Sequence, residues 1–198
     1  VFSGFQVQAL YGFGERDNLA SEGVVTEAQL SYTQGPIAVS YSMGKIAAAP
    51  TDATTFGALA ASSTQAALNA ASAGTESKEN RLMASYDLGV AKIMAHYNSD
   101  DIKNGNEGKG FLIGGLIPVG AGEIRLAYST YKIDTVGADP RSNKIALGYV
   151  HNLSKRTALY ATYAHVSNKN GAAQSLNGSV TAAGDNSNGY DFGIRHSF

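Results

Sequence analysis

The stretch Gly189-Tyr190-Asp191-Phe192-Gly193-Ile194-Arg195-His196-Ser197-Phe198 decides the fold. One parity holds apolar residues: Tyr190, Phe192, Ile194 and Phe198. The other parity holds polar or small residues: Asp191, Gly193, Arg195 and Ser197. Side chains of a strand alternate between its two faces, so this stretch predicts a strand with one apolar and one polar face. In a closed membrane barrel, such a strand turns its aromatic side chains toward lipid.

The same alternation recurs along the chain and has a period of 2, which excludes amphipathic helices in these segments. It predicts about ten strands, near residues 4–12, 25–34, 36–45, 79–88, 90–98, 109–118, 122–132, 142–151, 155–166 and 189–198. Only the stretch 111–117 has no clear parity. The fold class predicted is therefore all-β, a transmembrane antiparallel up-and-down β-barrel.

The expected connections alternate between short and long. The short ones are 34–35, 88–89, 119–121 and 152–154, and the long ones are 13–24, 46–78, 99–108, 133–141 and 167–188. Outer-membrane barrels have short periplasmic turns and longer extracellular loops, so the pattern favours this class. The last long connection is rich in Asn, Ser, Gly and Ala and is expected to be mobile.

Composition agrees with a barrel. The chain has 23 Gly and 11 Tyr, no Cys and no Trp, and 43% hydrophobic residues. It contains no run of about 18 apolar residues, as a membrane helix would need, whereas a barrel strand shows lipid only every second residue. The net charge of -1 argues against a nucleic-acid partner. The four His have no ligand spacing and no nucleotide or hydrolase motif is present, so neither a metal nor a cofactor is expected.

Tyrosines form a second pattern, because they share the parity of the apolar residues. They are Tyr11, Tyr32, Tyr41, Tyr86, Tyr97, Tyr128, Tyr149, Tyr163 and Tyr190. Rings with a polar tip suit the headgroup level of a bilayer, so these residues predict an aromatic girdle on the lipid-facing side.

The opposite parity carries basic residues: Arg81, Lys92, Arg125, Lys144, Arg156 and Arg195. A charge facing mid-bilayer lipid costs roughly 2–4 kcal/mol, so these side chains should point into the lumen. Fewer acidic residues are expected there, namely Glu27, Glu123 and Asp191. Inward cations stabilise a passing anion, which predicts a water-filled channel for passive diffusion of small hydrophilic solutes with a preference for anions. The alternative is that the charges only hydrate a wide channel and pair with neighbouring acids.

Four segments resemble the Gram-negative trimeric porins of the beta-proteobacterial general-diffusion type: Phe2–Glu15, Pro118–Gly122, Tyr149–Tyr160 and Gly193–Phe198. The resemblance implies a homotrimer in the outer membrane whose barrel has about sixteen strands. Residues 1–198 would then be one domain, the C-terminal portion of the barrel, without the loop that forms the family's constriction. It also implies that Tyr190, Phe192, Ile194 and Phe198 form the signal for the outer-membrane assembly machinery.

Two other classes remain open at this point. A complete barrel of about ten strands could be a protease-like outer-membrane enzyme, in which Asp100-Asp101 would activate water together with His96 or His165. A soluble all-β binding module would instead need its apolar faces to meet in one core.

Overall fold

The computed structural model describes residues 3–13, 24–47, 76–103, 106–135, 137, 139–177 and 179–198. Its strands are β1 (Phe5–Gly12), β2 (Val25–Gln34), β3 (Ile37–Ile46), β4 (Ser77–Asp87), β5 (Lys92–Ile102), β6 (Glu107–Val119), β7 (Gly122–Asp134), β8 (Arg141–Asn152), β9 (Thr157–Lys169) and β10 (Ser187–His196). In the described ranges, no helix has the length and apolar content needed to cross a membrane.

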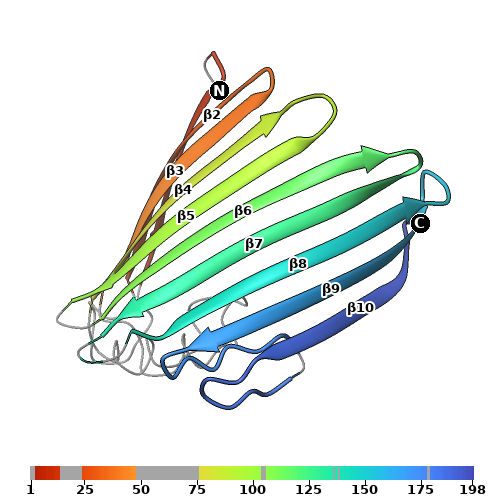
Figure 1. Ribbon diagram of the computed structural model, residues 1–198. Coiled ribbons are helices and arrows are strands. Elements are labelled where there is room, and N and C mark those ends of the chain that lie inside the picture. The colour runs from red at the N-terminus through yellow and green to blue at the C-terminus, as the bar shows by residue number, and fades with distance from the viewer. Residues whose placement is uncertain are drawn as a thin grey trace.

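All ten strands form one sheet in which each pairs antiparallel with the next in sequence, from β1 to β10. The sheet is curved and open, with β1 and β10 at its two edges (Figure 1). The predicted up-and-down order of about ten strands is therefore confirmed. The alternating parity also sets the register, since a slip of one residue would move every apolar side chain to the polar face.

Tight turns join the strands at one end of the sheet. Gly35-Pro36 links β2 to β3, and Gly120-Ala121 links β6 to β7. Gly35 and Gly120 have φ of 55° and 57°, which the first central position of a two-residue hairpin requires and which glycine adopts without strain.

Several strand ends differ from the prediction, most clearly at β5, β6, β9 and β10. β5 and β6 extend further than expected, so their connection is 103–106 instead of 99–108. β9 begins only at Thr157, because Ser154 Oγ accepts hydrogen bonds from the backbone N–H groups of Arg156 and Thr157 and closes a turn. β10 ends at His196, so Phe198 lies beyond the strand.

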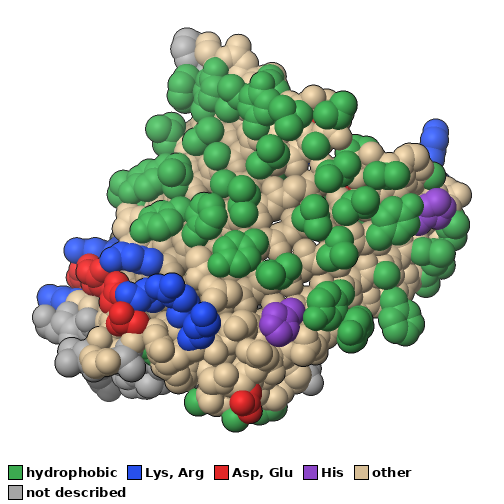
Figure 2. Space-filling view, in the orientation of Figure 1, with side chains coloured by type: hydrophobic (Ala, Val, Ile, Leu, Met, Phe, Trp, Pro, Cys, Tyr) green, Lys and Arg blue, Asp and Glu red, His purple; other side chains and the backbone are tan. Residues whose placement is uncertain are grey.

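The two faces of the sheet differ in chemistry as predicted. On β3, Tyr41 is 40% exposed on the apolar face, whereas its neighbour Ser42 is 5% exposed on the other. We call these the outward and the inward face. The register places all nine girdle tyrosines on the outward face, and Figure 2 shows that hydrophobic side chains cover this face over most of the sheet.

Buried apolar side chains are few in the described ranges. Ile102 and Ile133 pack together with Tyr131 on the inward face near the ends of β5 and β7. The stretch 111–117, which lacked a clear parity, places Phe111, Ile113 and Ile117 outward and exposed. The apolar surface of this sheet is therefore turned outward, as a lipid-facing wall requires.

Candidate functional site

The inward face carries five of the six basic residues predicted to line a lumen: Arg81, Lys92, Arg125, Lys144 and Arg195. Arg156 lies instead in the turn between β8 and β9, because the strand starts one residue later. Only Lys92 and Arg125 of the five share a level on the inward face. Lys92 and Arg125 both oppose Leu116 of β6, but Arg81 opposes Ser42 and Lys144 opposes Ser129. The described strands thus show a scattered set of cations and no complete ring.

Carboxylates neutralise two of these cations. Arg125 Nε donates a 2.6 Å hydrogen bond to Glu123 Oε1, and the Arg81 guanidinium forms an ion pair with Glu79. The described inward face also carries more acids than expected: Glu27, Glu79, Asp87, Asp100, Glu123 and Asp191. The expectation that acids are fewer was therefore wrong, because Glu79, Asp87 and Asp100 share the inward parity.

One inward acid is held by a hydrogen-bond network that the sequence pattern does not predict. Tyr131 Oη and Asn98 Nδ2 donate hydrogen bonds of 2.7 Å and 2.9 Å to Asp100 Oδ2. Glycines on β6, between these strands, make room for it: a Cβ on Gly108 would overlap Tyr131 Oη, and one on Gly110 would overlap Asn98 Oδ1. The sequence feature that predicts an inward Tyr131 is parity, because Tyr131 has the opposite parity from the outward Tyr128.

The connection between β9 and β10 covers part of the inward face. We call its described residues, 170–177 and 179–186, the inner strap. Asn168, at the end of β9, holds it: Asn168 Nδ2 donates to Gln174 O at 2.8 Å and Asp185 O at 2.6 Å, and Asn168 Oδ1 accepts from Gln174 N at 3.1 Å. The side chain of Asn168 therefore binds the strap near both of its ends.

Packing contacts hold the inner strap against the inward face of β9 and β10. A Cβ built on Gly189, an inward position of β10, would lie 2.8 Å from Leu176 Cδ1. Ser179 Oγ lies 3.2 Å from Ser187 Oγ, and Val166 and Ala172 are buried. The connection expected to be mobile therefore has defined contacts in its described residues, because Asn168 and the small inward side chains of β10 accommodate it.

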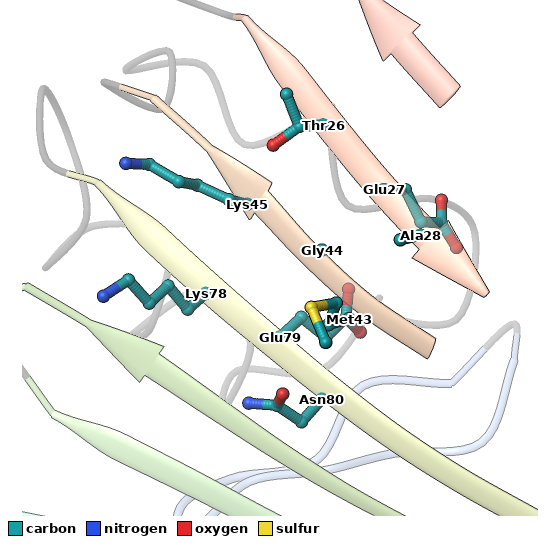
Figure 3. A pocket seen from close by; sticks show the side chains of 9 residues that line it. All are labelled: Thr26, Glu27, Ala28, Met43, Gly44, Lys45, Lys78, Glu79 and Asn80. Atoms are coloured by element: carbon teal, nitrogen blue, oxygen red, sulfur yellow. The ribbon is translucent and has the colours of Figure 1, made fainter. Parts of the chain in front are cut away.

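A pocket of about 340 Å³ lies where β2, β3 and β4 meet around Gly44 (Figure 3). Gly44 opposes both Glu27 and Glu79, and it has no side chain to fill the space between them. The pocket is an indentation of the wall. Among the described residues, no group of three His, Cys, Asp or Glu is placed to hold a metal ion.

The residues of the enzyme alternative are not brought together. His165 faces outward, where its Nδ1 lies 2.7 Å from Asn188 Oδ1. Asp101 also faces outward, whereas Asp100 and His96 face inward. Asp100 is held by Tyr131 and Asn98, and His96 Nε2 is buried without a hydrogen-bond partner in the described structure.

Comparisons with known proteins identify the family of this chain. A family model described as Gram-negative porin matches residues 1–171. Outer membrane porin protein 32 of Delftia acidovorans is 31% identical over 210 residues, which cover 100% of this chain and 54% of that protein. The chain thus spans about half the length of this curated relative.

Solved structures share the fold. Outer-membrane expressed OmpT of Vibrio cholerae superimposes with a TM-score of 0.67 at 20% identity, over 98% of this chain and 61% of that one. In-vitro folded OmpT in its trimer form gives a TM-score of 0.65 at 18% identity, over 97% and 60%. The family model, the Delftia relative and the antiparallel sheet agree: the chain belongs to the Gram-negative porins and is an outer-membrane β-barrel protein.

Proposed function

We propose that this chain forms the C-terminal portion of a trimeric barrel of about sixteen strands. The assembled barrel is a water-filled channel through which small hydrophilic solutes diffuse passively, without catalysis. The observation that supports this function is the division of one sheet into an exposed apolar outward face and a charged inward face. Such a sheet is stable when it closes between lipid and water.

We also propose that the channel prefers anions, through the cations that carboxylates do not neutralise. Arg81 and Arg125 are paired on their own strands. The ion pairs of the described residues do not include Lys92, Lys144 or Arg195. A free ammonium or guanidinium group on the inward face lowers the energy of a passing anion, whereas a paired one has little net field. The inward acids outside these ion pairs, Glu27, Asp87, Asp100 and Asp191, act in the opposite direction.

The experiment is planar-bilayer recording of the full-length source protein, with the reversal potential measured under a salt gradient. A large, steadily open conductance supports the channel, and a reversal potential on the anion side supports the selectivity. A cation-side potential would reject anion preference while keeping the channel. Well-folded protein that gives no conductance would reject the channel itself.

A further inference from the structure

The inward face has a sector with little charge on the first three strands. β1 to β3 form one side of the curved sheet (Figure 1). Of the inward positions on these three described strands, only Glu27 carries a charge. The next two strands, by contrast, place five charged residues inward: Glu79, Arg81, Asp87, Lys92 and Asp100. Side chains that attract or repel ions therefore lie mainly outside this sector.

Two cross-strand rows in this sector carry amide and hydroxyl groups. Gln6 opposes Ser31, which in turn opposes Ser40, and Gln8 opposes Gln29. We call these five residues the amide patch. Directly opposed side chains have Cβ atoms about 4.5–5.5 Å apart, and residues two apart on one strand share a face, so the five groups are close neighbours.

The protein does not use the amide patch for its own contacts. Among the described residues, no side-chain hydrogen bond involves any of these five side chains. Other inward amides are bonded, since Asn98 donates to Asp100 and Asn168 donates to the inner strap. The donors and acceptors of the amide patch are therefore available to water or to a solute in the lumen.

An apolar side chain extends the amide patch along β1. Leu10 is 55% exposed and has the inward parity of Gln6 and Gln8, whereas the exposed Phe5, Val7 and Tyr11 of the same strand have outward parity. Small-molecule sites combine apolar surface with a few hydrogen-bonding groups that fix the orientation of the ligand. A sugar or another polyol matches both parts, because it has C–H surface as well as neighbouring hydroxyl groups.

We propose that the amide patch and Leu10 form a binding site for uncharged polyhydroxylated solutes, such as sugars and sugar alcohols. The inference rests on the proposed channel and names a class of solute for it. A hydroxyl group and a side-chain amide can each donate and accept, so neighbouring hydroxyls of a polyol can bond to Gln8 and Gln29 at the same time. An inorganic ion gains less here, because the five side chains carry no counter-charge.

The test measures the conductance of the full-length protein in planar bilayers as sorbitol is added. Each value is divided by the conductivity of the bulk solution, which removes the effect of viscosity. Triethylene glycol is the comparison solute, because it is uncharged and of similar size but has hydroxyl groups only at its ends. The variant is Q8M/Q29M, which replaces two amides with unbranched apolar side chains of similar length. The matched control is Q34M, the same change at an outward position of β2.

The wild-type conductance should fall with sorbitol and reach a plateau. The sorbitol concentration at half effect should rise about tenfold in Q8M/Q29M, because two hydrogen bonds are lost. The control should match the wild type, and triethylene glycol should give no plateau.

Three results would overturn the site: a sorbitol response without a plateau in the wild type, an unchanged half-effect concentration in Q8M/Q29M, or an equal rise in Q34M. An equal plateau with triethylene glycol would reject the recognition of hydroxyl groups. Folded protein that gives no conductance without sorbitol would reject the channel itself, so failure of the site and failure of the channel are distinguishable.

Discussion

Ser142 Oγ donates a 2.7 Å hydrogen bond to Asn168 Oδ1 across β8 and β9, on the inward face. Both side chains are almost fully buried, at 3% and 5% exposure. Asn168 Oδ1 thereby accepts from Ser142 as well as from the backbone of Gln174. Because a buried amide with satisfied donors and acceptors is costly to disrupt, this pair determines where the inner strap lies.

Replacing Asn168 with Ala should release the inner strap. The backbone groups of Gln174 and Asp185 would lose their partners, at a local cost of about 1–3 kcal/mol. Amide exchange at Gln174 should then accelerate, and single-channel conductance should rise as the strap leaves the wall. Asn188→Ala, which changes an outward amide on β10, is the control. Unchanged exchange and conductance in Asn168→Ala would show that other contacts hold the strap.

Glycine at position 110 should be required by the network around Asp100. A Cβ there would overlap Asn98 Oδ1 and approach Tyr131 Cδ2 to 3.0 Å, so Gly110→Ala should lower the free energy of unfolding by about 1–3 kcal/mol. Gly115→Ala on the same strand is the control, because its Cβ would meet nothing closer than Lys92 O at 3.8 Å. Denaturant unfolding of refolded protein checks both, and equal stability of the two variants would contradict the steric argument.

The sequence predicted most of the sheet because the alternation of apolar and polar residues arises within each strand. Where a strand faces lipid, it presents mainly apolar side chains at every second position, and the tyrosines follow the same rule. The inner strap and the Asp100 network could not be predicted in this way. They depend on contacts such as Asn168 with Gln174 and Asp100 with Tyr131, which form only after register has brought the strands together. Arg156 was misplaced because a serine turn delays the start of β9.

An ion pair at the strand ends should make this part of the protein sensitive to acid. Glu76 lies just before β4, and its Oε2 is 2.6 Å from Lys45 Nζ. The hydrogen bond from Lys45 lowers the pKa of Glu76 below its ordinary value of 4.5. A lowered pKa means that the stabilisation is complete above the unfolded-state value and is lost as pH falls through the folded-state value.

Amide protection at the paired ends of β3 and β4 should therefore fall below pH 4.5 in the wild type. Glu76→Gln should have lower protection at neutral pH and little further change on acidification. Hydrogen exchange followed by mass spectrometry at several pH values measures this. If Glu76→Gln kept the full acid response, other carboxylates would be responsible for that response.

The two kinds of inward cation should differ in their effect on selectivity. Lys144→Gln removes a charge with no carboxylate partner among the described residues, whereas Arg125→Gln removes one already paired with Glu123. The anion-to-cation permeability ratio, from reversal potentials, should fall for Lys144→Gln and change less for Arg125→Gln. A larger effect at Arg125 would show that ion pairing on the inward face does not decide which cations set the selectivity.

Phe198 should contribute to assembly more than to the stability of the folded sheet. It lies beyond β10, fully exposed, and contacts only the ring of His196 at 4.9 Å among the described aromatic pairs. Tyr190, Phe192 and Ile194 continue the same apolar parity on β10. Within the described sheet this side chain buries little area and contributes little folding energy. The role we expect for its apolar ring is contact with the outer-membrane assembly machinery. Phe198→Ala should therefore lower the yield of trimer in the outer membrane, measured by heat-dependent gel mobility, while Phe198→Tyr preserves it. Refolding of purified Phe198→Ala into detergent should be normal. If the in vitro refolding fails as well, Phe198 stabilises the barrel itself and the assembly role is wrong.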